Sequence, residues 1–164
     1  MDLHALLLSA RGRIGRKAFW IGVMWLFLAA FVLSLPIGLW ATWAEKSMPA
    51  QEVEQRLGLM KLALNAALFY PSLCLNTKRL HDHGRSGWWQ LLPAAFIAPA
   101  MAISALAGGP EALSAKPGLA LLVLASAVLG LGAWLGMFVY LGFAKGADAE
   151  NRFGKPGDGE GRRE

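Results

Sequence analysis

The stretch from Ala18 to Trp43, AFWIGVMWLFLAAFVLSLPIGLWATW, contains no charged residue and is long enough to cross a bilayer as one helix. About 20 apolar residues span the ~30 Å of hydrocarbon in a membrane, whereas the apolar core of a secretory signal has only about 7–15 residues. We therefore expect this stretch to stay in the mature protein as a signal anchor, although it follows a basic cluster formed by Arg11, Arg13, Arg16 and Lys17.

Three further apolar segments approach or exceed this length, at Leu57–Leu75, Trp88–Leu106 and Leu119–Ala144. In none of them do apolar and polar residues alternate as they would in a strand. Every backbone group inside a bilayer must also form a hydrogen bond within its own segment, which favours helices. A composition of 55% hydrophobic and 16% charged residues excludes an ordinary soluble domain. The sequence therefore predicts an all-α integral membrane bundle of four transmembrane helices.

Two shorter segments lie outside these spans. The N-terminal leucines, near helical spacing at Leu3, Leu6 and Leu7, predict a short interfacial helix before the basic cluster. The Gly-rich, charged segment 154–164 predicts a disordered cytoplasmic tail, which leaves residues 1–153 as a single membrane domain.

The basic residues alternate between the two sides of the predicted membrane. Four Lys or Arg precede the first span, two follow it, three lie between the second and third spans, one precedes the fourth, and five follow it. Cytoplasmic loops carry an excess of Lys and Arg. The N-terminus, the central segment and the C-terminus are therefore predicted to be cytoplasmic.

Several residues within the spans are unusual for lipid-facing helices. Lys61 and Asn65 make the second span the weakest, with Lys61 expected to extend to the surface and Asn65 to bond to another helix. Prolines at 71, 93 and 99 are expected to bend the second and third spans. Gly132 and Gly136 form a small-residue face that predicts helix packing within the chain or, second, a homo-oligomer.

The densest polar motif is the central segment Thr77–Trp89, which we expect to be a loop. His81 and His83 with Asp82 could ligate a metal, but no third ligand is evident nearby. Ser86 with a histidine base could serve hydrolysis, but no elbow motif surrounds it. A third interpretation is a phosphate clamp made by Arg79 and Arg85, and a fourth is that the cations only set topology and contact anionic lipid.

Three motifs carry a resemblance across nearly the whole chain. They are Gly12-Arg-Ile-Gly-Arg-Lys-Ala-Phe-Trp20, Lys78-Arg-Leu-His-Asp-His-Gly-Arg-Ser-Gly-Trp-Trp89 and Asn151-Arg-Phe-Gly154. In this order they resemble the bacterial domain of unknown function 805 family of small inner-membrane proteins. The resemblance implies a membrane location and several helices, and it transfers no activity to any residue. The family pattern has a small or polar residue where His83 stands.

All three motifs fall on the predicted cytoplasmic side, where they are expected to form one polar site. Its members would be Arg13, Arg16, Arg79, His81, Asp82, Arg85, Ser86, Asn151 and Arg152. The site is predicted to bind an anionic lipid headgroup or a protein partner, without catalysis, metal or cofactor, and the scattered cations disfavour nucleic acid. The alternatives are a transporter or channel subunit with a path along Asn65, Ser72 and Tyr70, and an enzyme that uses His81 and Asp82.

Overall fold

The computed structural model describes residues 3–108 and 115–156, and within these ranges the fold is all-helical. The elements are α1 (Leu3–Leu8), α2 (Arg16–Ser47), α3 (Ala50–Asp82), the 3-10 helix η1 (Gly87–Leu91), α4 (Leu92–Leu106) and α6 (Pro117–Phe143). Four helical segments are long and apolar enough to cross a membrane, and η1 with α4 forms the third of them. The predicted all-α class and the four spans are confirmed.

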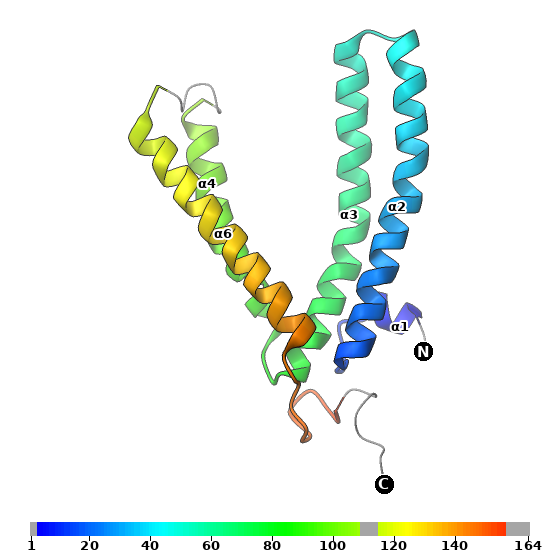
Figure 1. The fold of residues 1–164 in the computed structure, drawn as a ribbon, viewed down its shortest axis with the longest axis vertical. Helices are drawn as coiled ribbons and strands as arrows, with labels where there is room; N and C mark the ends of the chain where they lie inside the picture. Colours follow the sequence, from blue (N-terminus) through cyan, green and yellow to red (C-terminus); the bar gives the residue numbers. More distant parts are fainter. Residues whose placement is uncertain (1–2, 109–114, 157–164) are drawn as a thin grey trace.

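The spans form two antiparallel hairpins, α2 with α3 and α4 with α6 (Figure 1). The hairpins meet at one end and diverge toward the other. We call the joined end the base, defined by the start of α2 at Arg16 and the ends of α3 and α6 at Asp82 and Phe143. The opposite end, where α2 passes into α3, is the far end.

Glycines let the helices approach closely at three places. A Cβ on Gly22 of α2 would lie 2.5 Å from Leu75 of α3, and one on Gly130 of α6 would lie 2.5 Å from Ile97 of α4. Near the base, a Cβ on Gly142 of α6 would lie 2.7 Å from the ring of Trp20 in α2. The indole Nε1 of Trp20 also donates to the carbonyl of Gly142 at 3.1 Å, which joins the two hairpins.

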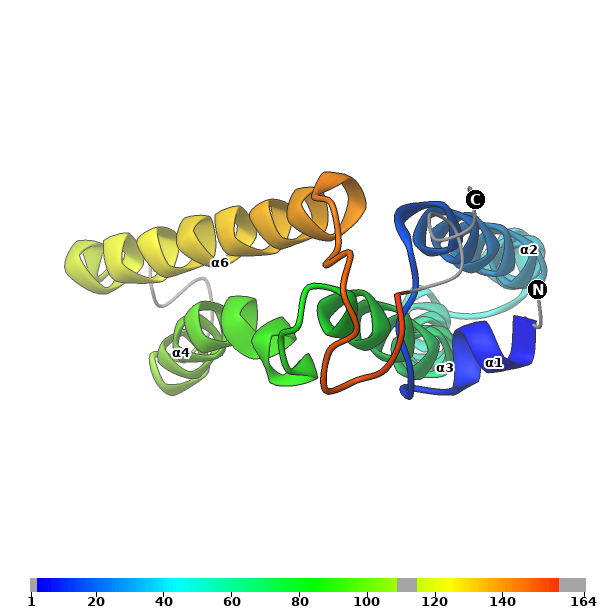
Figure 2. The same cartoon turned by 90° about the horizontal axis from the view of Figure 1, so that it is seen from below.

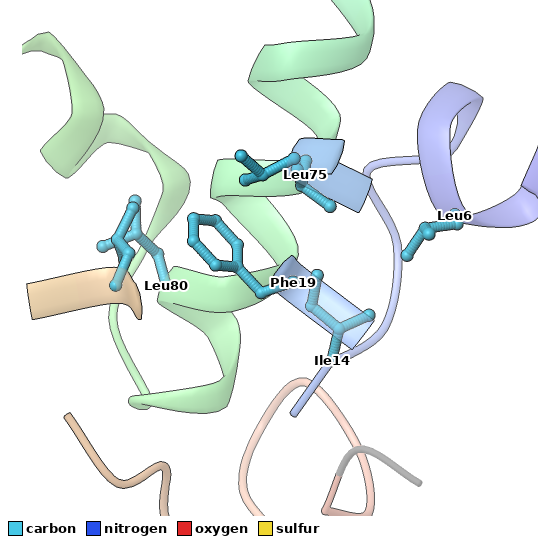
Figure 3. Packing of buried hydrophobic residues seen from close by; sticks show 7 residues of the cluster. Leu6, Ile14, Phe19, Leu75 and Leu80 are labelled. Carbon is cyan, nitrogen blue, oxygen red and sulfur yellow. The ribbon is translucent and has the colours of Figure 1, made fainter. Parts of the chain in front are cut away.

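The hydrophobic core lies at the base rather than in the middle of the spans. It contains Leu6, Ile14, Phe19, Leu75, Leu80 and Leu141, with Val23 beside them (Figure 3). In the most apolar window of each span, by contrast, at most 17% of the residues are buried inside the molecule. Such extensive apolar exposure is stable in lipid and not in water.

Helix α3 differs from the sequence prediction at both ends. It begins at Ala50, seven residues before the predicted Leu57, and it continues through Asp82, so the first half of the predicted central loop is helical. The polar start was missed because Gln51–Arg56 carries the residues of an exposed helix and not of a span. The helical end matters for function, because it places Arg79 and Asp82 on one face at i, i+3.

Pro93 acts differently from the prediction. Pro93 lies in the first turn of α4, where its missing N–H breaks no helical bond, so it begins that helix instead of interrupting it. Pro71 and Pro99 lie inside continuous helices.

Two glycines of the small-residue face of α6, Gly132 and Gly136, make no close contact within the described chain. A Cβ on Gly132 or Gly136 would meet no heavy atom within 4 Å. These glycines therefore do not serve the predicted packing inside the monomer, and the homo-oligomer stays a prediction.

Candidate functional site

The three polar motifs meet at the base. Arg13 lies just before α2, Arg79–Asp82 forms the last turn of α3, and residues 145–156 follow α6. Seen from below, this last segment crosses the end of α3, while α1 lies along the side of α3 (Figure 2). Segments up to 141 residues apart in sequence are thereby joined.

Arg13 holds the C-terminal segment against α3. Its side chain is fully buried, and its guanidinium lies 3.0 Å from Oδ1 of Asp82. The remaining donors reach the carbonyls of Ala147 at 2.5 Å, Ala149 at 2.9 Å and Gly154 at 3.0 Å. Two further bonds run from Nε to Oδ1 of Asp82 and from Nη2 to the Asp82 carbonyl. A guanidinium has five N–H donors, and all five are used in these bonds within the protein. None is left for an external ligand.

Arg79 joins α3 to the end of α6. Its side chain is also fully buried; Nε donates to the carbonyl of Leu141 at 2.7 Å and Nη2 to that of Ala144 at 2.5 Å. These carbonyls lie at the C-terminus of α6, where helix geometry leaves them without intrahelical partners. Nη1 reaches the carbonyl of Ile14 at 3.3 Å and forms an ion pair with Oδ2 of Asp82.

Asp82 is the shared anion of the two guanidiniums, one on each carboxylate oxygen, with a side chain that is 6% exposed. Its backbone carbonyl also accepts a hydrogen bond from the N–H of Ala147 at 2.9 Å. Gly146 passes so close that a Cβ there would lie 1.8 Å from Oδ2. We call the group Arg13, Arg79, Asp82 and Gly146 the charged junction.

A second buried cation attaches α1. Lys78 is 3% exposed, and its ammonium donates to the carbonyls of Ala5 at 2.5 Å and Leu6 at 2.6 Å. These carbonyls are among the unsatisfied acceptors at the end of α1, where a cation is favourable. Tyr70, on the same flank of α3, donates to the carbonyl of Leu8 at 3.3 Å.

The third motif closes over His81. Asn151 donates to the carbonyl of His81 at 3.0 Å, and the ring of Phe153 stacks on the imidazole with centroids 3.8 Å apart. Nδ1 of His81 lies 3.2 Å from the carbonyl of Gly12, and the guanidinium of Arg152 lies 4.7 Å from the Phe153 ring. The imidazole is thus held between the N-terminal and C-terminal segments.

The predicted site is therefore divided into a buried and an exposed part. Arg13, Arg79 and Asp82 are buried, with His81 and Asn151 packed beside them. The other members are exposed or have neighbours outside this buried part among the described residues. Arg16 and Arg152 are exposed, exposed Arg85 lies 4.7 Å from the ring of Trp89, and the Ser86 hydroxyl accepts from the backbone of Trp88.

In the described part of the chain, the residues of the catalytic and metal alternatives have separate surroundings. His81 faces Phe153, whereas His83 faces the ring of Tyr140 at 4.5 Å, so the two imidazoles have different neighbours. Among residues 3–108 and 115–156, no group of three potential ligands could hold a metal ion. Asp82 is engaged by two guanidiniums and orients neither imidazole by a recorded hydrogen bond within that part of the chain.

His83 should make stability depend on pH. Burial lowers the pKa of His83, and the nearby Arg79, Arg85 and Arg13 lower it further against the opposing effect of Asp82. The unfolded chain, with an imidazole pKa of about 6.5, then binds more protons as the pH falls below that value. We expect the thermal midpoint in detergent to fall between about pH 6.5 and 5. A smaller fall for His83→Gln would support this account; an unchanged one would contradict it.

Sequence reasoning missed Lys78, Gly146 and Phe153. In the sequence, Lys78 looks like one more cation that sets topology. Only its position, four residues after Cys74 and eight after Tyr70, places it on the flank of α3 that contacts α1. No pattern marks Gly146, whose role arises from the path of a loop. Phe153 belongs to a motif that was quoted, but its stacking partner is 72 positions away.

Known proteins resemble this chain at the level of family and sequence. The family model described as "Protein of unknown function (DUF805)" matches residues 7–155. The uncharacterized protein YiiR of Escherichia coli K12 is 32% identical over 93 residues, which are 56% of this chain and 53% of that protein. The inner membrane protein YhaH of the same strain is 30% identical over 82 residues, or 50% of this chain and 60% of that protein.

The chain thus spans just over half the length of the curated relatives that it matches. No solved structure matches. The match of the family model includes all three motifs that form the base, from the segment of Arg13 to Gly154. This chain belongs to the DUF805 family of uncharacterised, membrane-type proteins.

Proposed function

We propose that this protein is a non-enzymatic multi-pass protein of the bacterial inner membrane, with a cytoplasmic base whose exposed cations bind anionic phospholipid headgroups. One observation carries the proposal: the described charges are distributed unequally between the two ends. The base exposes seven cations and two carboxylates, namely Arg11, Arg16, Lys17, Arg85, Lys145, Arg152, Lys155, Asp148 and Glu150.

The far end is nearly balanced. Its cations are Lys46, Arg56, Lys61 and Lys116, and its carboxylates are Glu45, Glu52 and Glu54. An excess of Lys and Arg favours the cytoplasmic side, and both the start and the end of the described chain lie at the base (Figure 1). This charge difference supports an orientation with both termini in the cytoplasm, and the name of the relative YhaH supports the inner membrane as the location.

The charged junction holds the segments of the base together and does not itself bind lipid. In this way it supports the lipid proposal, because it keeps the exposed cations in place. Arg13 and Arg79 already bond to protein oxygens, so a phosphate would have to displace those bonds. Arg85 and Arg152 are free of that constraint, since each lies over an aromatic ring and stays exposed. Trp88 and Trp89 lie beside Arg85 with 78% and 47% exposure, as side chains at headgroup depth do.

The test is native mass spectrometry of the detergent-purified chain, with and without the double substitution Arg85→Ala/Arg152→Ala. We expect the wild type to retain phosphatidylglycerol or cardiolipin and the variant to retain at least about threefold less, because each surface cation near anionic lipid contributes about 1 kcal/mol.

The matched control is Arg56→Ala, which removes an exposed cation at the far end. It should retain as much lipid as the wild type. Equal lipid retention by all three proteins would contradict lipid binding by the base. A complex with another protein that is present in the wild-type spectrum and lost in the double variant would indicate a protein partner instead.

A further inference from the structure

A polar flank of α3 is left uncovered inside the membrane layer. Seven positions of this helix follow a heptad-like spacing and are buried or half-buried, namely Val53, Leu57, Met60, Leu64, Leu68, Pro71 and Leu75. Leu75 lies against Gly22 of α2, so this is the side of α3 that faces α2. Lys61 and Asn65 each come one residue after such a position, so they share the neighbouring flank. Both side chains are exposed.

This flank points toward the second hairpin. Tyr70 and Cys74 each come one residue before an α2-facing position, and Tyr70 bonds to α1, so α1 occupies the opposite flank. Arg79 lies 18 residues after Lys61, which is five full helical turns, and it bonds to the end of α6. Because the hairpins diverge from the base, α6 lies farther from α3 toward the far end (Figure 1).

The depth of the two residues places them in the leaflet at the far end. At 1.5 Å per residue, Lys61 lies about 27 Å along α3 from Arg79, and Asn65 about 21 Å. Measured from a base at headgroup level, the ~30 Å hydrocarbon layer then ends just beyond Lys61. Neither side chain has a recorded hydrogen bond or ion pair with any of the residues 3–108 and 115–156, and an unbonded amide in hydrocarbon is costly.

We propose that Lys61 and Asn65 bind the headgroup of one phospholipid from the far-end leaflet, which lies between the two hairpins. The ammonium pairs with the phosphate and the amide donates to an ester carbonyl, since one helical turn separates the two groups by about 6 Å along α3. The flanking apolar positions exposed on this helix, Leu62 and Phe69, offer a surface for acyl chains.

A second copy of the chain fits this flank less well. Two copies share one orientation in the membrane, so α3 would pair in parallel and bring two Lys61 ammoniums to the same depth. Like charges that face each other in a poorly solvated interface are destabilising. The phosphodiester of a phospholipid carries the opposite charge, so it can pair with Lys61 without this repulsion. The charge of Lys61 therefore favours a bound lipid over a second copy of the chain.

The experiment is native mass spectrometry of the full chain, purified in mild detergent, with the fraction carrying phospholipid as the readout. We compare the wild type with two variants, Lys61→Ala/Asn65→Ala and the charge-preserving Lys61→Arg. The control is Arg56→Ala, which removes an exposed cation of the same helix. We expect the double variant to lose one bound phospholipid, with at least a fivefold smaller fraction, and Lys61→Arg and Arg56→Ala to keep it.

Phospholipid retention that does not change in the double variant would overturn the proposal. So would a wild-type dimer that dissociates in the double variant, because a second copy would then occupy the flank. The base proposal is tested separately, since Arg85→Ala/Arg152→Ala leaves Lys61 and Asn65 intact and should still carry this lipid.

Discussion

Replacing Asp82 by alanine is expected to destabilise the protein more than any other single substitution at the base. The change leaves two fully buried guanidiniums without their shared anion. Removing one partner of a buried ion pair typically costs about 3–5 kcal/mol, which is a large part of the stability of a small domain. We expect little folded Asp82→Ala protein after detergent extraction, measured by size-exclusion chromatography and thermal unfolding.

Two comparisons separate this effect from a general loss of charge. Asp82→Asn keeps the shape of the side chain and one acceptor oxygen, so its stability should lie between those of the wild type and Asp82→Ala. Asp148→Ala removes a carboxylate from an exposed pair with Lys145, for which about 0–1 kcal/mol is typical. If Asp148→Ala were as unstable as Asp82→Ala, the special role of the buried carboxylate would be wrong.

Gly146→Ala is expected to have the second largest effect, although it adds only a methyl group. That Cβ would lie 1.8 Å from Oδ2 and 2.5 Å from Cγ of Asp82, so either the loop after α6 or the carboxylate must move. Overpacking of this kind costs about 1–3 kcal/mol, and a displaced carboxylate adds the loss of its ion pairs. We expect a lower thermal midpoint and faster proteolysis of the segment after α6.

The matched control is Gly58→Ala in α3, where a Cβ would meet no heavy atom within 4 Å. Alanine is favoured over glycine in a helix by about 0.5–1 kcal/mol, so this variant should be unchanged or slightly more stable. Equal behaviour of Gly146→Ala and Gly58→Ala would show that the loop does not pass close to Asp82.

Hydropathy was enough to predict the spans because the bilayer imposes a length and an internal hydrogen-bond pattern on every crossing segment. The boundaries of α3 were less predictable. Its exposed first turns and its last turns carry polar residues for two unrelated reasons, solvent contact and burial in the charged junction. A sequence shows the charges but not which of them will be buried.

The convergence of the three motifs on one side of the membrane followed from counting charges, but their pairing did not. Asp82 had several candidate partners in the sequence, and the fold selects Arg13 and Arg79 while Arg85 turns outward to Trp89. The carbonyls that bind Arg13 and Arg79 are backbone groups at helix ends and in loops. No side-chain pattern could identify them, because every residue carries a carbonyl.

The central claim is that Arg13, before the first span, pairs with Asp82, at the end of the second, inside a buried junction. A double-mutant cycle of Arg13→Gln and Asp82→Asn, read from unfolding free energies in detergent, tests it most directly. We expect both single variants to be destabilised and the double variant to lose at least about 1 kcal/mol less than their sum, as expected for residues in contact. Additive losses, typical of residues that do not touch, would contradict it.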